Sequence, residues 1–185
     1  MIEKKNINVC VFCGSKHGKS YEYFEKSKQL GHYISKNKWN LVFGGGNQGL
    51  MGAIASGFDC TRAKMFSIVP TALNKKKILV KNPNKKILVS NLFLRKKKMI
   101  SLSDVFIVLP GGIGTLDELF EVMALNYLKI NNKKIVILNF NNYWDPLKRL
   151  IENMKKNEFI DKKNEAHIYF FNTLDKAIKF IQNNL

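Results

Sequence analysis

The strongest chemical signal in the sequence is a glycine-rich turn that ends in a carboxylate. Residues 110–118 read Pro-Gly-Gly-Ile-Gly-Thr-Leu-Asp-Glu and follow the apolar run 105–109. Glycines allow backbone N–H groups to approach an anion closely, and the N-terminus of the following helix adds its positive dipole end. We therefore predict a phosphate cradle formed by the amides of residues 111–115. Glu118, which closes the turn, is the group that could make this binding site catalytic.

A second interpretation of Glu118 is structural, because Thr115 and Glu118 have the T-x-x-E spacing of a capping box. In that motif the two side chains bond to the free N–H groups at the start of a helix. The spacing alone favours the cap. The glycine turn before it, and Glu121 on the same helix face, favour chemistry instead. Near a helix N-terminus a carboxylate is stabilised in its ionised form, so we expect Glu118 to be ionised.

A basic cluster at residues 95–98 lies near the beginning of a predicted helix, 92–101. One interpretation is a helix face covered by solvated charges. However, the arginine fork matches the geometry of a phosphate better than any other side chain. This helix also precedes the strand that leads into the cradle. We therefore expect Arg95 to face the ligand.

These residues need a framework, and the sequence alternates short apolar runs with helical patterns from end to end. Continuous apolar strands that alternate with helices predict a parallel sheet covered on both faces, a doubly wound, Rossmann-like α/β fold. We expect one domain over residues 1–185 and a charged loop at 75–83. The predicted strands are 7–12, 40–43, 65–69, 87–89, 105–109, 134–138 and 167–171, and the predicted helices 23–34, 50–58, 92–101, 116–128, 143–157 and 174–181.

Three glycine-bearing turns, at residues 14–15, 44–46 and 111–114, follow predicted strands. In a doubly wound sheet, ligands lie beyond the carboxyl ends of the strands, where these turns meet. Residues 44–49 match the dinucleotide spacing G-x-G-x-x-G, but residues 67–71 lack the acidic group that would hold a ribose. We therefore favour a mononucleotide or sugar phosphate over NAD. The substrate contacts expected from the first two turns are Gly14, Ser15, Gly45 and Gly46.

The three cysteines do not predict a disulfide framework or a metal site. Cys10 and Cys13 have a C-x-x-C spacing, but residues three apart in a strand point to opposite faces. The histidines lack the i, i+4 spacing of metal ligands. No apolar run reaches the roughly 18 residues of a membrane helix, and no export signal is visible. We therefore expect a cytoplasmic protein with no membrane partner and no metal.

The net charge of +17 raises the question of nucleic acid. Apart from the cluster at 95–98, the basic residues are scattered in pairs and triplets near asparagines. We interpret this as a compositional bias with solvated lysines, and we do not expect a nucleic-acid partner. Attraction of small anionic molecules is compatible with either interpretation.

Four segments together resemble the Lonely Guy family of phosphoribohydrolases, which is often labelled "lysine decarboxylase-like". The similarity extends from about residue 7 to about residue 160, and the block P-G-G-x-G-T-x-x-E is highly specific. The family commonly has Met-His where this chain has Leu92 and Phe93, and often a tryptophan where it has Leu125. The four segments are residues 9–15, 44–52, 95–99 and 110–118.

The resemblance implies a Rossmann-like homodimer that hydrolyses the N-glycosidic bond of a nucleoside 5′-monophosphate. The products are free base and ribose 5-phosphate, and the substrates include AMP and the N6-modified, cytokinin-type AMPs. Arg95 and Glu118 fall on catalytic positions, and no cofactor is implied. A different function, a non-catalytic nucleotide or molybdopterin-type carrier with the same turns, stays open. The implied substrate-binding positions are Lys96, Gly111, Gly112, Ile113, Gly114, Thr115 and Asp117.

Overall fold

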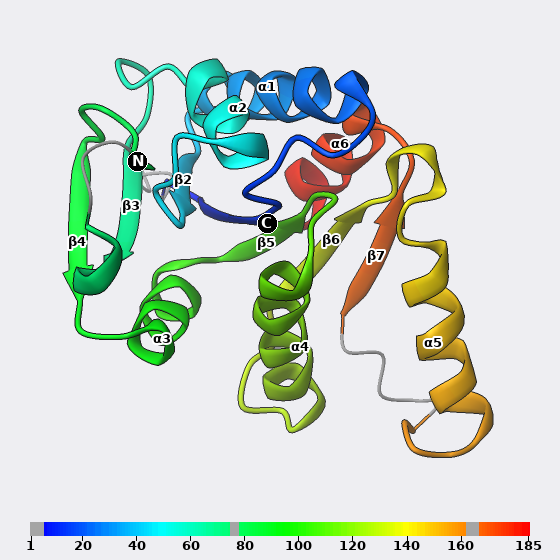
Figure 1. The fold of residues 1–185 in the computed structure, drawn as a ribbon. Coiled ribbons are helices and arrows are strands. Elements are labelled where there is room, and N and C mark those ends of the chain that lie inside the picture. The colour runs from blue at the N-terminus through cyan, green and yellow to red at the C-terminus, as the bar shows by residue number, and fades with distance from the viewer. Residues whose placement is uncertain (1–5, 75–77, 162–166) are drawn as a thin grey trace, which may run out of the picture.

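A seven-stranded parallel sheet forms the centre of the computed structural model, which describes residues 6–74, 78–161 and 167–185 (Figure 1). The strand order is β4-β3-β2-β1-β5-β6-β7, and every neighbouring pair is parallel. This confirms the predicted doubly wound sheet. The strands are β1 (Asn8–Phe12), β2 (Asn40–Phe43), β3 (Met65–Pro70), β4 (Lys85–Val89), β5 (Val105–Val108), β6 (Lys134–Leu138) and β7 (Ile168–Phe171).

Helices cover both faces of the sheet, with α1, α2 and α6 on one face and α3, α4 and α5 on the other (Figure 1). Right-handed crossovers between parallel strands produce this two-sided cover. The helices are α1 (Tyr21–Lys36), α2 (Gly49–Gly57), α3 (Leu92–Leu102), α4 (Ile113–Tyr127), α5 (Asp145–Lys156) and α6 (Leu174–Asn184), with short 3-10 helices at Thr71–Leu73 and Phe140–Asn142.

The hydrophobic core consists of one cluster on each face of the sheet. Leu30 of α1 belongs to the first cluster, and Leu119 of α4 belongs to the second. Cys13 lies in the first cluster and Cys10 in the second, which confirms that their side chains point to opposite faces. Burial raises the pKa of both thiols, so they stay protonated and act as small apolar groups.

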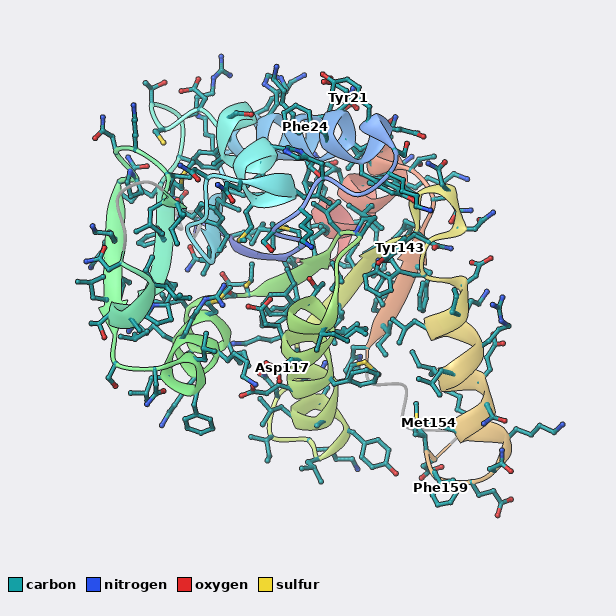
Figure 2. The ribbon with its side chains drawn as sticks, viewed as in Figure 1. Tyr21, Phe24, Asp117, Tyr143, Met154 and Phe159 are labelled. Carbon is teal, nitrogen blue, oxygen red and sulfur yellow. The ribbon has the colours of Figure 1, made fainter. Side chains whose placement is uncertain are left out.

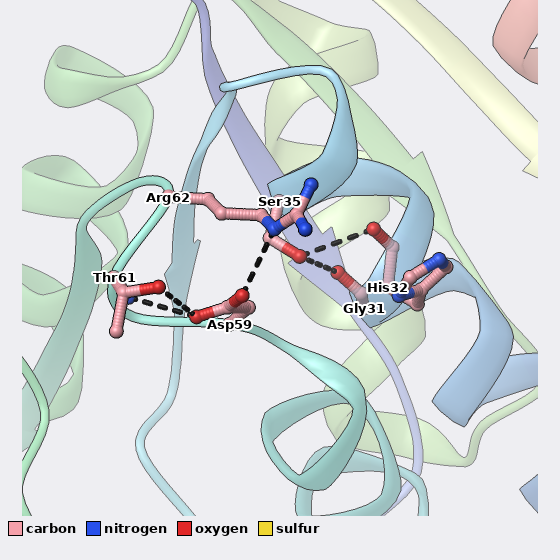
Figure 3. A network of polar contacts seen from close by, with 6 residues as sticks. All are labelled: Gly31, His32, Ser35, Asp59, Thr61 and Arg62. Carbon is pink, nitrogen blue, oxygen red and sulfur yellow. Dashed lines mark hydrogen bonds and ion pairs between the residues drawn. The ribbon is translucent and has the colours of Figure 1, made fainter.

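Helices α1 and α2 pack unusually closely on their face of the sheet. A side chain on Gly31 would clash with the carbonyl oxygen of Ile54, so glycine permits the approach. Ser35 Oγ donates to the carbonyls of Gly31 and His32 at 3.2 and 3.1 Å (Figure 3). Asp59 accepts from Arg62 at 3.0 Å in the turn after α2. These two sets of contacts are local, one within α1 and one in the turn after α2, and both lie outside the site described below.

The strands β2, β3 and β4 are added one after another on one side of β1, and the chain then returns to place β5 on the other side of β1. The turns after β1 and β5 therefore lie side by side, with Gly14 N–H donating to the carbonyl of Pro110 at 3.0 Å. A Cβ on Gly14 would lie 3.4 Å from the Cα of Gly111, so the two backbones are in contact. This is the switch point at which doubly wound folds bind ligands.

All seven predicted strands and six predicted helices are present, with shifted ends. Helix α4 begins at Ile113, three residues earlier than predicted, because Gly112 serves as its N-cap. Helix α5 begins two residues later than predicted, after Asn141 and Asn142 adopt left-handed φ values of 52° and 57°. In the predicted loop, residues 75–77 lie outside the described residues, and Leu79 forms a bridge with Gly46.

Within the described ranges, no helix is long and apolar enough to cross a membrane.

Candidate active site

A cavity of about 590 Å³ lies at the carboxyl edge of the sheet, beyond β1, β2 and β5. Helices α3 and α4 contribute most of its charged lining, with Lys16 from the turn after β1. Tyr143, from the connection after β6, lies on the other side of α4 from Asp117 (Figure 2). Most of the predicted site residues meet here. Those that line the cavity are Gly14, Ser15, Arg95, Lys96, Gly111, Gly112, Ile113, Gly114, Thr115, Asp117 and Glu118.

The predicted cradle is a helix start with free backbone donors. Within the part of the chain that the structure describes, the N–H groups of residues 111–114 donate to no other residue. The N–H of Thr115 is different, because it donates to the carbonyl of Gly112 at 3.0 Å. Thr115 therefore drops out of the predicted set of amides. A side chain on Gly111 would clash with the hydroxyl of Thr115, so the Thr115 side chain packs directly against the turn.

The capping-box interpretation of Glu118 is wrong. The N-cap of α4 is Gly112, and no side chain forms a cap hydrogen bond there. Glu118 therefore belongs to the second turn, and its side chain is buried against α3. Its Oε1 lies 3.3 Å from Nη2 of Arg95, and the exposed fractions of the two side chains are only 10% and 17%. Glu118 is free of any capping role and is available for chemistry.

The expectation that the helix terminus keeps Glu118 fully ionised is also wrong. Desolvation by burial raises the pKa of Glu118 to about 7, although the nearby charge of Arg95 lowers it. The helix dipole acts mainly within the first turn, and Glu118 lies beyond it. Both protonation states of this carboxyl are therefore accessible near neutral pH.

Arg95 reaches Glu118 because Gly44, in the turn just after β2, leaves room for it. The side chain of Asn91 caps α3 by accepting from Leu94 N–H at 2.9 Å, which sets the start of the helix that carries Arg95. A Cβ on Gly44 would clash with Nη2 of Arg95. Nε of Arg95 is buried without a hydrogen-bond partner among the described residues. Arg95 itself lines the cavity, so its guanidinium brings a positive charge to the site beside Glu118.

Lys96 joins α3 to α4 through two carboxylates. Its Nζ lies 2.7 Å from Oδ1 of Asp117 and 2.7 Å from Oε2 of Glu121. Hydrogen bonds to Asp117 and then Glu121 raise the pKa of Lys96. The lysine charge is therefore already matched by acidic partners, although Lys96 and Asp117 both line the cavity.

Gly45 and Gly46 do not line the cavity, whereas their neighbour Gly44 does. Gly45 has a φ of 78°, and a side chain there would clash with the hydroxyl of Ser67. A side chain on Gly46 would meet Met51. Backbone conformation and close packing therefore account for these two glycines, and the predicted substrate contacts lack geometric support.

The structure also shows where the residues lie at which the chain departs from the Lonely Guy pattern. Phe93 is 66% exposed and lies outside the cavity, whereas Leu92 lines it. Leu125 is half-buried and packs against the second hydrophobic cluster. The histidine that Phe93 replaces therefore corresponds to a position outside the cavity lining of this chain.

Sequence reasoning missed an aromatic part of the cavity, formed by His17, Tyr23 and Tyr143. Tyr143 Oη donates to the carbonyl of Gly111 at 2.6 Å. Their place in the sequence could have indicated two of these residues, because His17 and Tyr143 follow the carboxyl ends of the strands β1 and β6. Across the described residues, no group of three or more His, Cys, Asp or Glu could hold a metal ion.

Comparison with known proteins finds a matching family and similar sequences. The family model described as "Possible lysine decarboxylase" matches residues 51–181. A probable cytokinin riboside 5′-monophosphate phosphoribohydrolase of Oryza sativa subsp. japonica is 36% identical over 160 residues, 86% of this chain and 66% of the relative. The chain thus spans about two thirds of that relative's length.

Two further relatives carry the same activity in their names, cytokinin riboside 5′-monophosphate phosphoribohydrolase. The Arabidopsis thaliana protein is 36% identical over 169 residues, 91% of this chain and 74% of its own length. The Rhodococcoides fascians protein is 31% identical over 177 residues, 95% of this chain and 89% of its own length.

Solved structures with the same fold include proteins that bind molybdenum cofactor. The molybdenum cofactor binding protein of Rippkaea orientalis has a TM-score of 0.75 at 20% identity and covers 97% of this chain and 98% of its own. The Moco carrier protein of Chlamydomonas reinhardtii has a TM-score of 0.70 at 17% identity and covers 97% of both chains. At these identities the likeness shows the fold alone.

Proposed function

The chain belongs to the Lonely Guy family, whose model is described as "Possible lysine decarboxylase", and from this premise we propose that it hydrolyses the N-glycosidic bond of a nucleoside 5′-monophosphate. The proposed substrates are AMP or an N6-modified, cytokinin-type AMP. The observation that carries the proposal is one cavity that holds both the free amides of residues 111–114 and the buried pair Arg95–Glu118.

In this proposal the backbone binds the 5′-phosphate. Lys96 is already bound to two carboxylates, so the partners left for an anion are the free amides at the start of α4, with Lys16 as a further cation in the cavity lining. A helix N-terminus binds anions through its orphan N–H groups and its dipole. The phosphate would then be a handle that positions the sugar, and its binding energy would help to orient the reacting bond.

The reaction breaks the bond between C1′ of the ribose and a nitrogen of the base. Water adds to C1′, the bonding electron pair leaves with the base, and the base nitrogen gains a proton. Positive charge develops on the sugar, so an adjacent carboxylate stabilises the transition state and orients the water. Glu118 supplies that carboxylate when ionised, and the guanidinium of Arg95, 3.3 Å away, places a positive charge beside it in the cavity lining.

The proposal is tested by incubating the purified protein with AMP and with N6-isopentenyl-AMP and measuring free base by chromatography. We expect base and ribose 5-phosphate in equal amounts from at least one monophosphate. Adenosine should be a far poorer substrate, because it lacks the phosphate handle. The variant Glu118→Gln, purified identically, controls for contaminating hydrolases. Absence of base release from every common nucleoside monophosphate would contradict the proposal.

A carrier function is the second candidate, because the same cavity could hold an intact nucleotide or a molybdopterin-type molecule. Its support is the shared fold with proteins named for molybdenum cofactor. Recovery of an intact ligand with the purified protein, together with no base release, would favour it. The decarboxylase description has less support, since Lys96 is held protonated by two carboxylates and is a poor Schiff-base nucleophile.

We also propose that the chain acts as a cytoplasmic homodimer without membrane or nucleic-acid partners. The support is membership in the Lonely Guy family. Size-exclusion chromatography with light scattering at micromolar concentration tests the dimer, and a monomeric mass would contradict it.

A further inference from the structure

We propose that Tyr143 is a positioning residue that holds the peptide between Gly111 and Gly112 in the orientation needed to bind phosphate. The inference rests on the proposed function, because it assumes that the turn receives the phosphate of a nucleotide. Its central observation is the 2.6 Å hydrogen bond from Tyr143 Oη to the carbonyl of Gly111. This bond joins the connection after β6 to a turn 32 residues earlier in the chain.

The peptide bond itself explains why a contact on the Gly111 carbonyl matters for the Gly112 amide. A trans peptide is planar, so its C=O and N–H groups point in opposite directions. Glycine has few conformational restraints, and two adjacent glycines allow the peptide between them to rotate. A rotated peptide would present a carbonyl oxygen where the anion should bind. The hydroxyl of Tyr143 selects the orientation in which Gly112 presents its N–H.

The connection before α5 is built to hold Tyr143 in place. Asn141 and Asn142 both have left-handed φ values, a conformation that asparagine tolerates better than most residues. Asn139 Oδ1 accepts from the N–H of Trp144 at 2.6 Å, and its Nδ2 donates to Asp145 at 2.8 Å. The side chain of Asn139, before Tyr143, thus ties down the two residues that follow the tyrosine and fixes the backbone from which its ring projects.

The ring of Tyr143 is held independently of its hydroxyl. It packs edge-on against Trp144, with centroids 4.8 Å apart, and against Tyr23, with centroids 5.9 Å apart. Trp144 is itself buried. Removal of the hydroxyl should therefore leave the ring in position and delete only the hydrogen bond to Gly111. Tyr143→Phe is consequently a clean test of the proposal.

The matched control is Tyr33→Phe, which removes a tyrosine hydroxyl bonded to Asp175 at 2.9 Å, away from the cavity. Calorimetry with ribose 5-phosphate and with AMP measures the affinity of each variant. We expect Tyr143→Phe to bind both about tenfold more weakly than the wild type, as for the loss of one hydrogen bond that orients the binding turn. Tyr33→Phe should bind like the wild type. Unchanged affinity in Tyr143→Phe would overturn the proposal.

Adenosine separates phosphate positioning from a general loss of structure. Tyr143→Phe should lower the preference for AMP over adenosine, whereas a distorted cavity would weaken both ligands equally and overturn the proposal. In turnover with AMP, we expect KM to rise about tenfold while kcat changes by less than about twofold. Binding does not require turnover, so failure of the proposed hydrolysis and failure of the Tyr143 inference are distinguishable.

A second measurement covers the case in which the variant fails to fold. Wild-type protein labelled with nitrogen-15 is titrated with ribose 5-phosphate, and the backbone amide resonances are followed by NMR. We expect the largest shifts at Gly112 and its neighbours in the turn. A Gly112 resonance that does not move while ligand binds would overturn the proposal.

Discussion

Two sets of charged residues connect α3 to α4, and they differ in burial although they adjoin in sequence. Arg95 and Glu118 form a buried pair 3.3 Å apart. One residue further along α3, Lys96 contacts Asp117 and Glu121, and the exposed fraction of the Asp117 side chain is 58%. Burial raises the pKa of the Glu118 carboxyl to about 7. In the second set Lys96 is as buried as Arg95, and only the carboxylates are more exposed, Glu121 to 25%.

The two sets thus differ in the burial of their carboxyl groups rather than in the presence of opposite charges, and this difference supports Glu118 as the proposed reactive group. A carboxylate that meets solvent is screened by water, so its ion pair contributes less free energy. A carboxyl held in a water-poor cavity has an altered protonation equilibrium and a strong field around it. In the proposed function, Glu118 and Arg95 therefore perform the chemistry, and Lys96 with its two partners has a mainly architectural role.

The largest expected effect is on turnover in Glu118→Gln. This change removes the charge that would stabilise the sugar cation while it keeps the size of the side chain. We expect a loss of kcat of about a hundredfold to ten-thousandfold, measured by base release from AMP. Glu121→Gln, which changes a more exposed carboxylate of the second set, is the matched control and should cost less than about tenfold. Similar losses of kcat in Glu118→Gln and Glu121→Gln would show that burial of the carboxyl does not mark the reactive group.

The next largest effect is expected from Gly44→Ala. The new methyl group would displace the guanidinium of Arg95 from Glu118. We expect kcat/KM to fall about a hundredfold, because small displacements of a positioned group are costly in catalysis. The second measurement is a double-mutant cycle with Arg95→Ala. Gly44→Ala should cause little further loss in that background, and an undiminished loss would show that Gly44 acts independently of Arg95.

The pH dependence of kcat/KM sharpens the comparison further. If ionised Glu118 is required, activity rises with pH through a midpoint near 7. The second ionisation of the substrate phosphate, near pH 6, also contributes to such a profile. Asp117→Asn distinguishes the ionisation of Glu118 from that of the substrate phosphate, because the charge of Asp117 raises the pKa of Glu118. We expect its midpoint at lower pH than in the wild type. A flat profile, or an unmoved midpoint, would argue against Glu118 as the titrating group.

The smallest expected effect is on stability. The pKa of Glu118 is raised above its ordinary value of 4.5, so the folded state binds this proton more tightly than the unfolded state. Glu118 therefore stabilises the fold least above pH 7, and its contribution declines as pH rises from 4.5 to 7. Gln does not titrate, so the Tm of Glu118→Gln relative to wild type should rise over that interval. Calorimetric melts showing a constant difference would contradict the shift.

Much of the framework could be predicted from the sequence because its signals are local. Apolar runs such as 105–109 and the glycines at 111–114 report strand, turn and helix start directly. The resemblance to the Lonely Guy family then assigned Arg95 and Glu118 to one site, and the structure brings them into contact. The cavity also contains Lys96 and Asp117, as the resemblance implied.

The remaining features depend on contacts between distant segments. The clash that excludes a side chain at Gly44 exists only because Arg95 reaches across from α3. The protonation of Glu118 depends on burial by surrounding elements, and helix position alone gave the wrong expectation. The bond from Tyr143 to Gly111 requires the connection after β6 to lie against the turn after β5. No local pattern encodes these three contacts.

The most direct test of the account is a crystal structure of Glu118→Gln with AMP bound. We predict that the phosphate accepts hydrogen bonds from the backbone amides at the start of α4. The ribose C1′ should face the side chain at position 118, with the guanidinium of Arg95 beside it. A nucleotide bound elsewhere, or a side chain at position 118 turned away from the ribose, would contradict the account.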